Sequence, residues 1–156
     1  MKIEWVEPGV IAAGGIPVGI QDLRSLHDQG IRAVVTLVEH PLTTQTKITS
    51  NILDEIGLVC LHAPIKDQHP PDMATVKMVG QFIDRMRAQR CPVYAHCHAG
   101  VGRTGTMLHA YYLTQGLSLE EVKEKVRAGK PSSQFLMLSD AQRAFLEKVA
   151  RGNVFG

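Results

Sequence analysis

The residues best suited to chemistry are a cysteine, two glycines and an arginine within residues 97–103. Only the thiolate of a cysteine is a strong nucleophile, and a helix N-terminus or a nearby cation lowers the thiol pKa from about 8.5 to roughly 3.5–7.5. Arg103 offers a planar fork of N–H donors that matches two oxygens of a phosphate group. Gly100 and Gly102 allow the curled backbone in which consecutive N–H groups converge on an anion. The spacing therefore predicts that Cys97 attacks a bound phosphate ester.

The segments on either side of this cluster are suited to holding it. Residues 92–95 form an apolar run typical of a buried strand, and residues 107–113 are typical of a helix. A strand, a glycine-rich turn and a helix in succession aim backbone N–H groups at an anion. The run His96-Cys97-His98 also suggests a metal site, but adjacent residues cannot easily converge on one ion and no second pair of ligands follows. We therefore predict no metal and no cofactor.

The Cys-x5-Arg-Thr sequence, preceded by His96 and carrying both glycines, resembles the phosphate loop of the cysteine-dependent protein tyrosine phosphatase superfamily, most closely the small atypical dual-specificity (VHZ-like) type. The resemblance implies that the Thr104 hydroxyl hydrogen-bonds the sulfur and makes it a better leaving group. It also implies that His96 supports the loop and is not a base. The residues expected to bind phosphate are His98, Ala99, Gly100, Val101, Gly102 and Arg103.

A second stretch, residues 64–72, is a proline-rich loop that follows a predicted strand. It is similar to the general-acid loop of the same family, in which an aspartate lies between prolines, and Asp67 matches that aspartate. Asp72 has a different reading, because it directly precedes the helical periodicity of residues 73–86 and is predicted to be an N-cap. Residues 14–17 match a family segment at the pocket mouth, so they are either a substrate-contacting loop or a plain connection.

Helical and strand-like segments alternate along most of the chain. Apolar runs predict buried strands at residues 31–38, 58–63 and 92–95, after a hairpin or edge strands in residues 5–13. Helical spacing predicts helices at residues 21–29, 43–57, 73–90, 104–115 and 118–128, and a last helix that starts at Ser132 or Ser139 and ends at residue 150. The alternation predicts a single-domain α/β fold, a central, mainly parallel sheet of four to five strands flanked by helices, as in Cys-x5-Arg phosphatases.

The composition is that of one globular domain. The chain has 156 residues, of which 44% are hydrophobic and 21% charged, so we expect one domain over residues 1–156 with a frayed tail at 151–156. The net charge of +2 is too small to indicate nucleic-acid binding. We expect no membrane anchor and no signal peptide, because no apolar run approaches the roughly 18 residues of a membrane span. The predicted protein is a cytoplasmic monomer.

The three cysteines are expected to be free thiols, because their number is odd and no secretion signal is evident. Cys60 lies in an apolar run and is predicted to be buried. Cys91 precedes the strand that leads to Cys97, and an extended strand would hold the two roughly 20 Å apart. A redox-protective pairing of these two would therefore need a rearrangement.

Together these patterns predict a phosphatase that removes phosphate from protein tyrosine, with phosphoserine and phosphothreonine as further candidate substrates. Cys97, Arg103, Asp67 and Thr104 are the expected catalytic residues. The alternative within enzymes is a phosphatase for phosphoinositides, inositol phosphates or RNA 5′-phosphates. The alternative from another class is a non-catalytic phosphate-binding module. Whether Gln134, Gln142 or neither orients the hydrolytic water is left open by the sequence.

Overall fold

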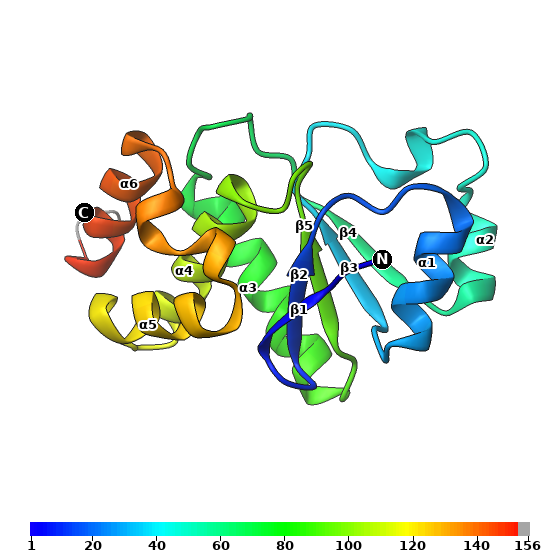
Figure 1. Ribbon diagram of the computed structural model, residues 1–156, viewed down its shortest axis with the longest axis horizontal. Helices are drawn as coiled ribbons and strands as arrows, with labels where there is room; N and C mark the ends of the chain where they lie inside the picture. Colours follow the sequence, from blue (N-terminus) through cyan, green and yellow to red (C-terminus); the bar gives the residue numbers. More distant parts are fainter. Residues whose placement is uncertain (153–156) are drawn as a thin grey trace.

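The computed structural model describes residues 1–152 and contains one five-stranded sheet (Figure 1). Its spatial order is β1-β2-β5-β3-β4. β1 is antiparallel to β2, and the other neighbouring pairs are parallel. The strands are β1 (Glu4–Glu7), β2 (Ile11–Gly14), β3 (Ala33–Thr36), β4 (Val59–His62) and β5 (Val93–His96). The predicted α/β fold with a mainly parallel central sheet is confirmed.

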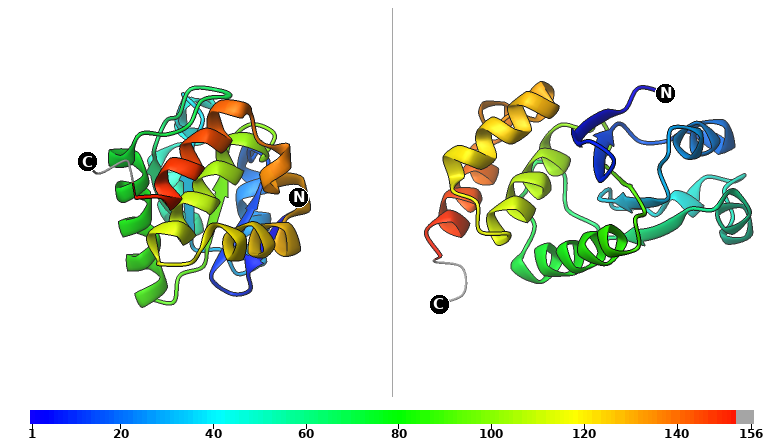
Figure 2. Two further views of the ribbon diagram at one scale, coloured as in Figure 1. Left: turned by 90° about the vertical axis from the view of Figure 1, so that its left-hand side faces the viewer. Right: turned by 90° about the horizontal axis from the view of Figure 1, so that it is seen from below.

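Helices cover both faces of this sheet (Figures 1 and 2). Side chains alternate between faces along a strand: Tyr94 of β5 packs toward α1 (Gly19–Asp28) and α2 (Ser50–Ile56). Its neighbours in β5, Val93 and Ala95, pack into the larger core on the other face. The helices on that face are α3 (Met73–Ala88), α4 (Gly102–Thr114), α5 (Leu119–Gly129) and α6 (Asp140–Ala150). Three short 3₁₀ helices complete the fold, η1 (Leu42–Thr44), η2 (Pro131–Ser133) and η3 (Phe135–Met137).

The four parallel strands end at the same level. In the strand register, His96 of β5 lies opposite Gly14 of β2 on one side and Thr36 of β3 on the other, and Thr36 lies opposite His62 of β4. The loops that follow these four strands therefore leave the sheet side by side, at the carboxyl ends of the strands, where ligands of parallel sheets bind. Cys97 is the first residue of the loop after β5.

Several predicted helix ends are confirmed. The Asp72 carboxylate accepts a hydrogen bond from the backbone N–H of Thr75 at 2.7 Å, as an N-cap does. Ser139 begins α6 with a reciprocal pair of capping bonds to Gln142, so the last helix starts at 139 and not at 132. Within residues 1–152 no helix combines the length and apolar character that crossing a membrane would take.

Two predictions about residues 43–60 are wrong, one on the segment between β3 and β4 and one on β4 itself. Residues 43–57 do not form one helix: α2 begins only after Thr49, whose hydroxyl caps it. Ile48 is buried although it lies in the preceding loop, which explains the misleading apolar spacing. Cys60 is exposed, because β4 is an edge strand and not an interior one. At the chain end, Arg151 and Gly152 form an exposed turn, and the rest of the predicted tail lies outside the described residues.

Candidate active site

The loop between β5 and α4 is pressed against the loop after β2. Gly100 has a φ of +79°, a conformation that favours glycine, and a Cβ at this position would lie 2.3 Å from the Gly14 carbonyl oxygen. The backbone N–H of Ile16 donates to the carbonyl of His98 at 3.0 Å. Tyr94 fixes the supporting loop in turn, since its hydroxyl donates to the Gly15 carbonyl at 2.6 Å. The fold thus holds the loop in a curl that no larger residue at position 100 could adopt.

His96 anchors the start of the loop from inside the sheet. Its imidazole is fully buried, with Nδ1 2.8 Å from the Cys97 carbonyl oxygen and Nε2 2.8 Å from the Thr36 hydroxyl. A carbonyl oxygen can only accept, so Nδ1 carries the proton and the Thr36 hydroxyl donates to Nε2. Burial lowers the pKa of His96 to about 4, so the ring is neutral near pH 7. These contacts are those of a structural support.

Cys97 lies at the bottom of the loop with 3% of its surface exposed. Burial works to raise the pKa of its thiol, but hydrogen bonds from the Thr104 hydroxyl and from the backbone N–H groups of Thr104 and Gly100 lower it, as does the charge of Arg103. The net effect is a pKa below the ordinary thiol value. The buried Thr104 hydroxyl has no other hydrogen-bond partner within residues 1–152 that would compete with the Cys97 sulfur.

The Arg103 guanidinium is held from the side of the neighbouring loops. Its Nη1 donates to the Glu39 carboxylate at 2.5 Å and to the Ile65 carbonyl at 3.0 Å. Its Nη2 lies 3.5 Å from the Asp67 carboxylate. The side chain is only 5% exposed. Since Nη1 is occupied, the Nε and Nη2 edge of the fork is the one left to bind two phosphate oxygens.

The loop after β4 carries Asp67 to the same place. The Asp67 side chain is 68% exposed, in contrast to the buried Arg103 that it approaches. Gln68 has a φ of +64°, and its carbonyl accepts a hydrogen bond from the Ser139 hydroxyl at 3.0 Å. The His69 Nδ1–H donates to the Asp67 carbonyl at 2.8 Å. The carboxylate therefore lies at the mouth of the site, where it can reach the oxygen of a leaving group.

The rest of the predicted phosphate-binding residues form the rim and wall of the loop. His98 and Ala99 are exposed, whereas Val101 and Gly102 are half-buried. A pocket of about 310 Å³ opens beside Arg103 and His98, and Ile16 is part of its wall, so the segment at 14–17 does reach the mouth.

Cys91 lies at the opposite end of β5 from Cys97, and all three cysteines are free. Within residues 1–152 no three His, Cys, Asp or Glu side chains converge as metal ligands would.

Two residues of the site, Glu39 and Ser133, were not predicted from the sequence, and a third, Gln142, was one of two open candidates. Glu39 pairs with Arg103, and its signal was available, because it follows the strand at 31–38 and the ends of parallel strands meet. The buried Ser133 hydroxyl contacts the carbonyls of Gly100 and Val101 at 3.0 and 3.1 Å. The buried Gln142 amide faces Gly102, because a Cβ added to Gly102 would lie 3.2 Å from the Gln142 Nε2. This nitrogen has no hydrogen-bond partner within residues 1–152. Nothing local to Ser133 or Gln142 predicts these contacts.

Comparison with known proteins gives a family for this arrangement. The model of the polymorphic toxin system DSP-PTPase phosphatases (Tc-R-P) matches residues 9–117. Human dual specificity protein phosphatase 12 is 31% identical over 132 residues, which are 83% of this chain and 36% of that protein, so the chain spans about a third of its length. Phosphatidylglycerophosphate phosphatase PTPMT2 of Arabidopsis thaliana is 25% identical over 140 residues, 88% of this chain and 58% of that protein.

Solved structures agree with this assignment. The active form of Tk-PTP superposes with a TM-score of 0.79 and 25% identity over 96% of both chains. PTPMT1 superposes with a TM-score of 0.80 over 99% of this chain and 97% of its own, and at 22% identity this likeness supports the fold alone. The family resemblance read from residues 96–104 is confirmed. The chain belongs to the DSP-PTPase family, as a small dual-specificity-type member of the cysteine-dependent phosphatases.

Proposed function

We propose that this protein hydrolyses phosphate monoesters through a phosphocysteine intermediate, with phosphotyrosine in proteins as the principal substrate. The observation that carries the proposal is the Cys97 thiol, which is buried at the bottom of the curled loop beside Arg103 and has a pKa below the ordinary thiol value. A thiolate at neutral pH is the nucleophile that such a reaction needs. The arginine and the loop N–H groups supply the positive charge that binds the phosphoryl oxygens.

In the first step the Cys97 sulfur attacks phosphorus in line with the leaving oxygen. A sulfur–phosphorus bond forms, the phosphorus–oxygen bond breaks, and Asp67 donates a proton to the departing oxygen. Arg103 and the loop N–H groups stabilise the equatorial oxygens during transfer. The exposure of Asp67 supports this role, because the acid must meet a leaving group that enters from solvent.

In the second step water attacks the phosphocysteine. The Asp67 carboxylate now accepts a proton from that water, and the phosphorus–sulfur bond breaks to release phosphate and the thiolate. The Thr104 hydroxyl lowers the energy of the departing thiolate by hydrogen bonding. Of the two glutamines left open by the sequence, we assign the orientation of the water to Gln142. Its buried Nε2 faces Gly102 of the phosphate loop and has no hydrogen-bond partner among residues 1–152, which supports this role.

A second candidate substrate class is a phospholipid or inositol phosphate. It is supported by the names of relatives, which include a phosphatidylglycerophosphate phosphatase and a PTPMT1 structure in complex with PI(5)P. The third reading, a phosphate-binding module without activity, is opposed by the presence of Cys97, Arg103 and Asp67 at one site. A thiolate nucleophile must also stay reduced, so we place the protein in a reducing compartment, the cytoplasm.

The test is Cys97→Ser, assayed with para-nitrophenyl phosphate and a phosphotyrosine peptide. We expect turnover to be abolished while phosphopeptide binding remains, because the hydroxyl is a far weaker nucleophile in an unchanged cradle. Rapid acid quenching of the wild type should trap phosphate on the peptide that contains Cys97. Orthovanadate should inhibit the wild type, and a chelator should leave its activity unchanged. Activity that persists in Cys97→Ser would rule out the thiolate mechanism.

A further inference from the structure

Glu39 places a fixed negative charge at the mouth of the phosphate site. The residue follows β3, and its carboxylate meets Arg103 Nη1 at 2.5 Å while 53% of the side chain stays exposed. Its own backbone N–H and the bond from Arg103 lower the pKa of this carboxyl, so it is ionised at neutral pH. The catalytic steps above do not use it. It lines the pocket beside Arg103 and His98, next to the position of a bound phosphate.

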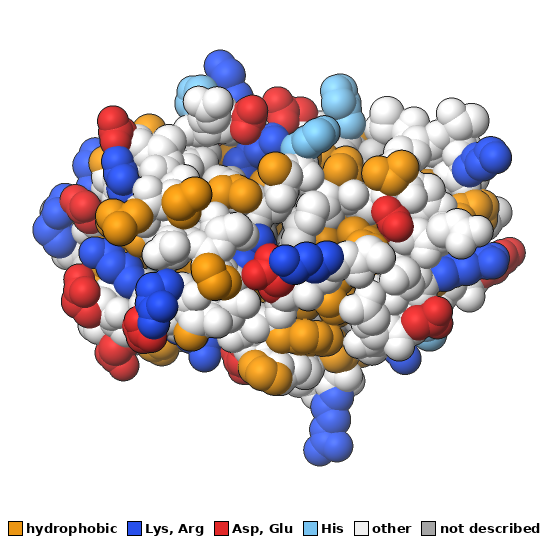
Figure 3. Space-filling model, in the orientation of Figure 1, with side chains coloured by type: hydrophobic (Ala, Val, Ile, Leu, Met, Phe, Trp, Pro, Cys, Tyr) orange, Lys and Arg blue, Asp and Glu red, His pale blue; other side chains and the backbone are white. Residues whose placement is uncertain are grey.

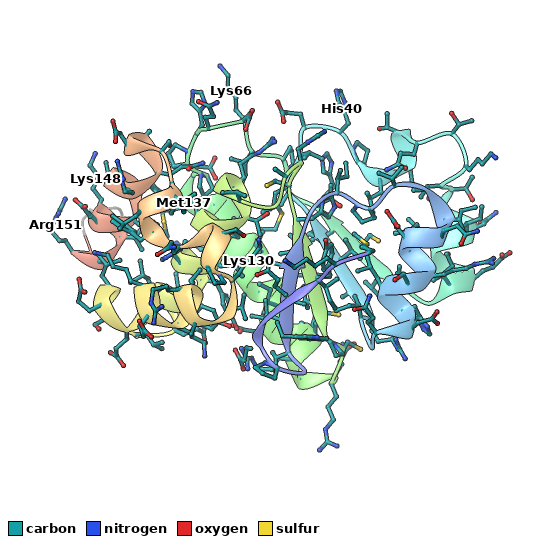
Figure 4. All side chains as sticks on the ribbon, in the orientation of Figure 1. His40, Lys66, Lys130, Met137, Lys148 and Arg151 are labelled. Atoms are coloured by element: carbon teal, nitrogen blue, oxygen red, sulfur yellow. The ribbon has the colours of Figure 1, made fainter. Side chains whose placement is uncertain are left out.

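In the pocket beside the phosphate site, Glu39 is balanced by the Arg103 side chain with which it pairs. Among the described residues that line it, Arg103 is the only arginine and no lysine is present. The walls are apolar, neutral or histidine side chains: Ile16, Val38, Pro41, Leu42, Thr44, Gln45, His40 and His98. Lys66 belongs to the acid loop, and its side chain projects away from the protein at the upper edge (Figure 4).

Acidic, histidine and basic side chains all lie along this same upper edge (Figure 3). The second acidic group at the site is Asp67, 3.5 Å from Arg103. Once a dianionic phosphate binds the Nε and Nη2 side of Arg103, the single positive charge of that side chain is shared between the phosphate and the Glu39 carboxylate, while Asp67, as the general acid, is protonated. The mouth is then negative overall. A second anionic group on the substrate would meet repulsion there.

We propose that Glu39 is a specificity-determining residue, and that it selects phosphate monoesters whose leaving group carries no further negative charge near the phosphate. This inference rests on the proposed function and names its substrate class more narrowly. The favoured substrate is a phosphotyrosine flanked by neutral or basic side chains. A multiply phosphorylated inositol or an anionic lipid headgroup is disfavoured, because its second phosphate would lie in the pocket that Glu39 borders.

The experiment compares wild type with Glu39→Gln, which keeps the shape and an oxygen that can accept from Arg103. The matched control is Glu55→Gln, which removes the same charge from the exposed surface of α2, away from the site. The substrates are a phosphotyrosine peptide with lysine on both sides, the same peptide with glutamate, a soluble inositol bisphosphate, and para-nitrophenyl phosphate as reference. Melting temperatures verify that all three proteins are folded.

We expect the wild type to prefer the lysine-flanked peptide over the glutamate-flanked peptide by about tenfold in kcat/KM at low salt. Glu39→Gln should reduce that ratio to about twofold and raise the inositol bisphosphate rate relative to para-nitrophenyl phosphate. Glu55→Gln should behave like wild type. High salt should diminish the wild-type preference, because the mouth is open to solvent.

Equal wild-type rates on the two peptides, or a ratio that Glu39→Gln leaves unchanged, would overturn the inference while leaving the phosphatase function intact. A wild-type preference for the inositol bisphosphate would overturn it in favour of the lipid-type substrate. Failure to hydrolyse para-nitrophenyl phosphate would instead defeat the proposed function. The charge preference would then be read from the affinities of the two peptides for wild type and Glu39→Gln, and equal affinities would reject it.

Discussion

The phosphate loop and the acid loop meet at Arg103 but are held in opposite ways. The phosphate loop packs against the Gly14 carbonyl, is bonded through Ser133 on its other side, and has fully buried His96 at its start. The acid loop presents Asp67 with 68% of its side chain exposed, attached through a 3.5 Å ion pair. The one loop is fixed by the core, whereas the other lies on the surface.

This difference matches the demands of the two roles. Stabilising charge on a phosphoryl group requires donors that are already in place before the reaction, and packing provides this. A general acid has to meet leaving groups of different shapes, and exposed loops can adjust to them. Substitutions of the packed glycine Gly100 should therefore affect folding and catalysis together, whereas substitutions of Asp67 should affect catalysis alone.

The largest expected effect is that of Asp67→Asn. Loss of the proton donor should lower kcat by about 10² to 10⁴ for an alkyl phosphate and far less for para-nitrophenyl phosphate, whose leaving group needs little protonation. The melting temperature should barely change. The measurement is kcat over a series of leaving groups with calorimetry of both proteins. An equal loss for all leaving groups would mean that Asp67 acts by holding Arg103 and not as an acid.

The second effect contrasts two thiols. Hydrogen bonds and Arg103 keep the pKa of Cys97 below its usual value. The residue Cys60 is exposed, but its thiol lies in a pocket lined by Leu53 and Leu61, and this desolvation, with the charge of Asp54, raises its pKa to about 11. At pH 7 iodoacetamide should alkylate Cys97 about 100-fold faster, since only thiolates react. As pH rises toward 11, the rate for Cys60 should rise and the ratio should fall. Peptide mapping follows both sites, and vanadate should protect only Cys97.

A third effect tests the packing of the phosphate loop. Gly100→Ala forces a Cβ against the Gly14 carbonyl in a left-handed conformation, so we expect a loss of about 2–4 kcal/mol in unfolding free energy and at least a tenfold fall in kcat/KM. The control is Gly116→Ala, where φ is also positive, at +96°, but a Cβ would meet nothing within 4 Å. Gly116→Ala should lose only about 1 kcal/mol and keep its activity. Equal losses in the two variants would show that backbone strain alone explains the requirement.

The smallest effect is that of Asp72→Ala, five residues beyond Asp67 in the sequence. Removing this N-cap leaves the Thr75 N–H without its partner and should cost about 1 kcal/mol of stability, with kcat nearly intact. Urea unfolding and steady-state kinetics measure the two quantities. If Asp72→Ala gave the loss that depends on the leaving group and Asp67→Asn did not, the roles of the two aspartates would be reversed.

The turns, the helix caps and the order of strands and helices depend on residues close together in the chain, so they could be predicted from the sequence. The curl at residues 97–103 is encoded by glycines between a strand and a helix. Asp72 could be recognised as a cap, and Ser139 as one of two candidates, because capping bonds span only three residues. The alternation of helices and apolar runs was enough to predict a parallel sheet. The carboxyl ends of parallel strands meet at one end of the sheet, and this places Cys97 and Asp67 close together.

The distant groups that complete the site depend on how the chain packs in three dimensions, and they could not be predicted from local patterns. That β4 is an edge strand follows from the pairing order, which no local pattern encodes, and so the exposure of Cys60 was mispredicted. The pairing of Glu39 with Arg103, and the contact of Gln142 with the loop at Gly102, join segments far apart in the sequence. Such contacts depend on how strand ends align and how helices pack, because each is set by the shape of the whole core and not by the residues beside it.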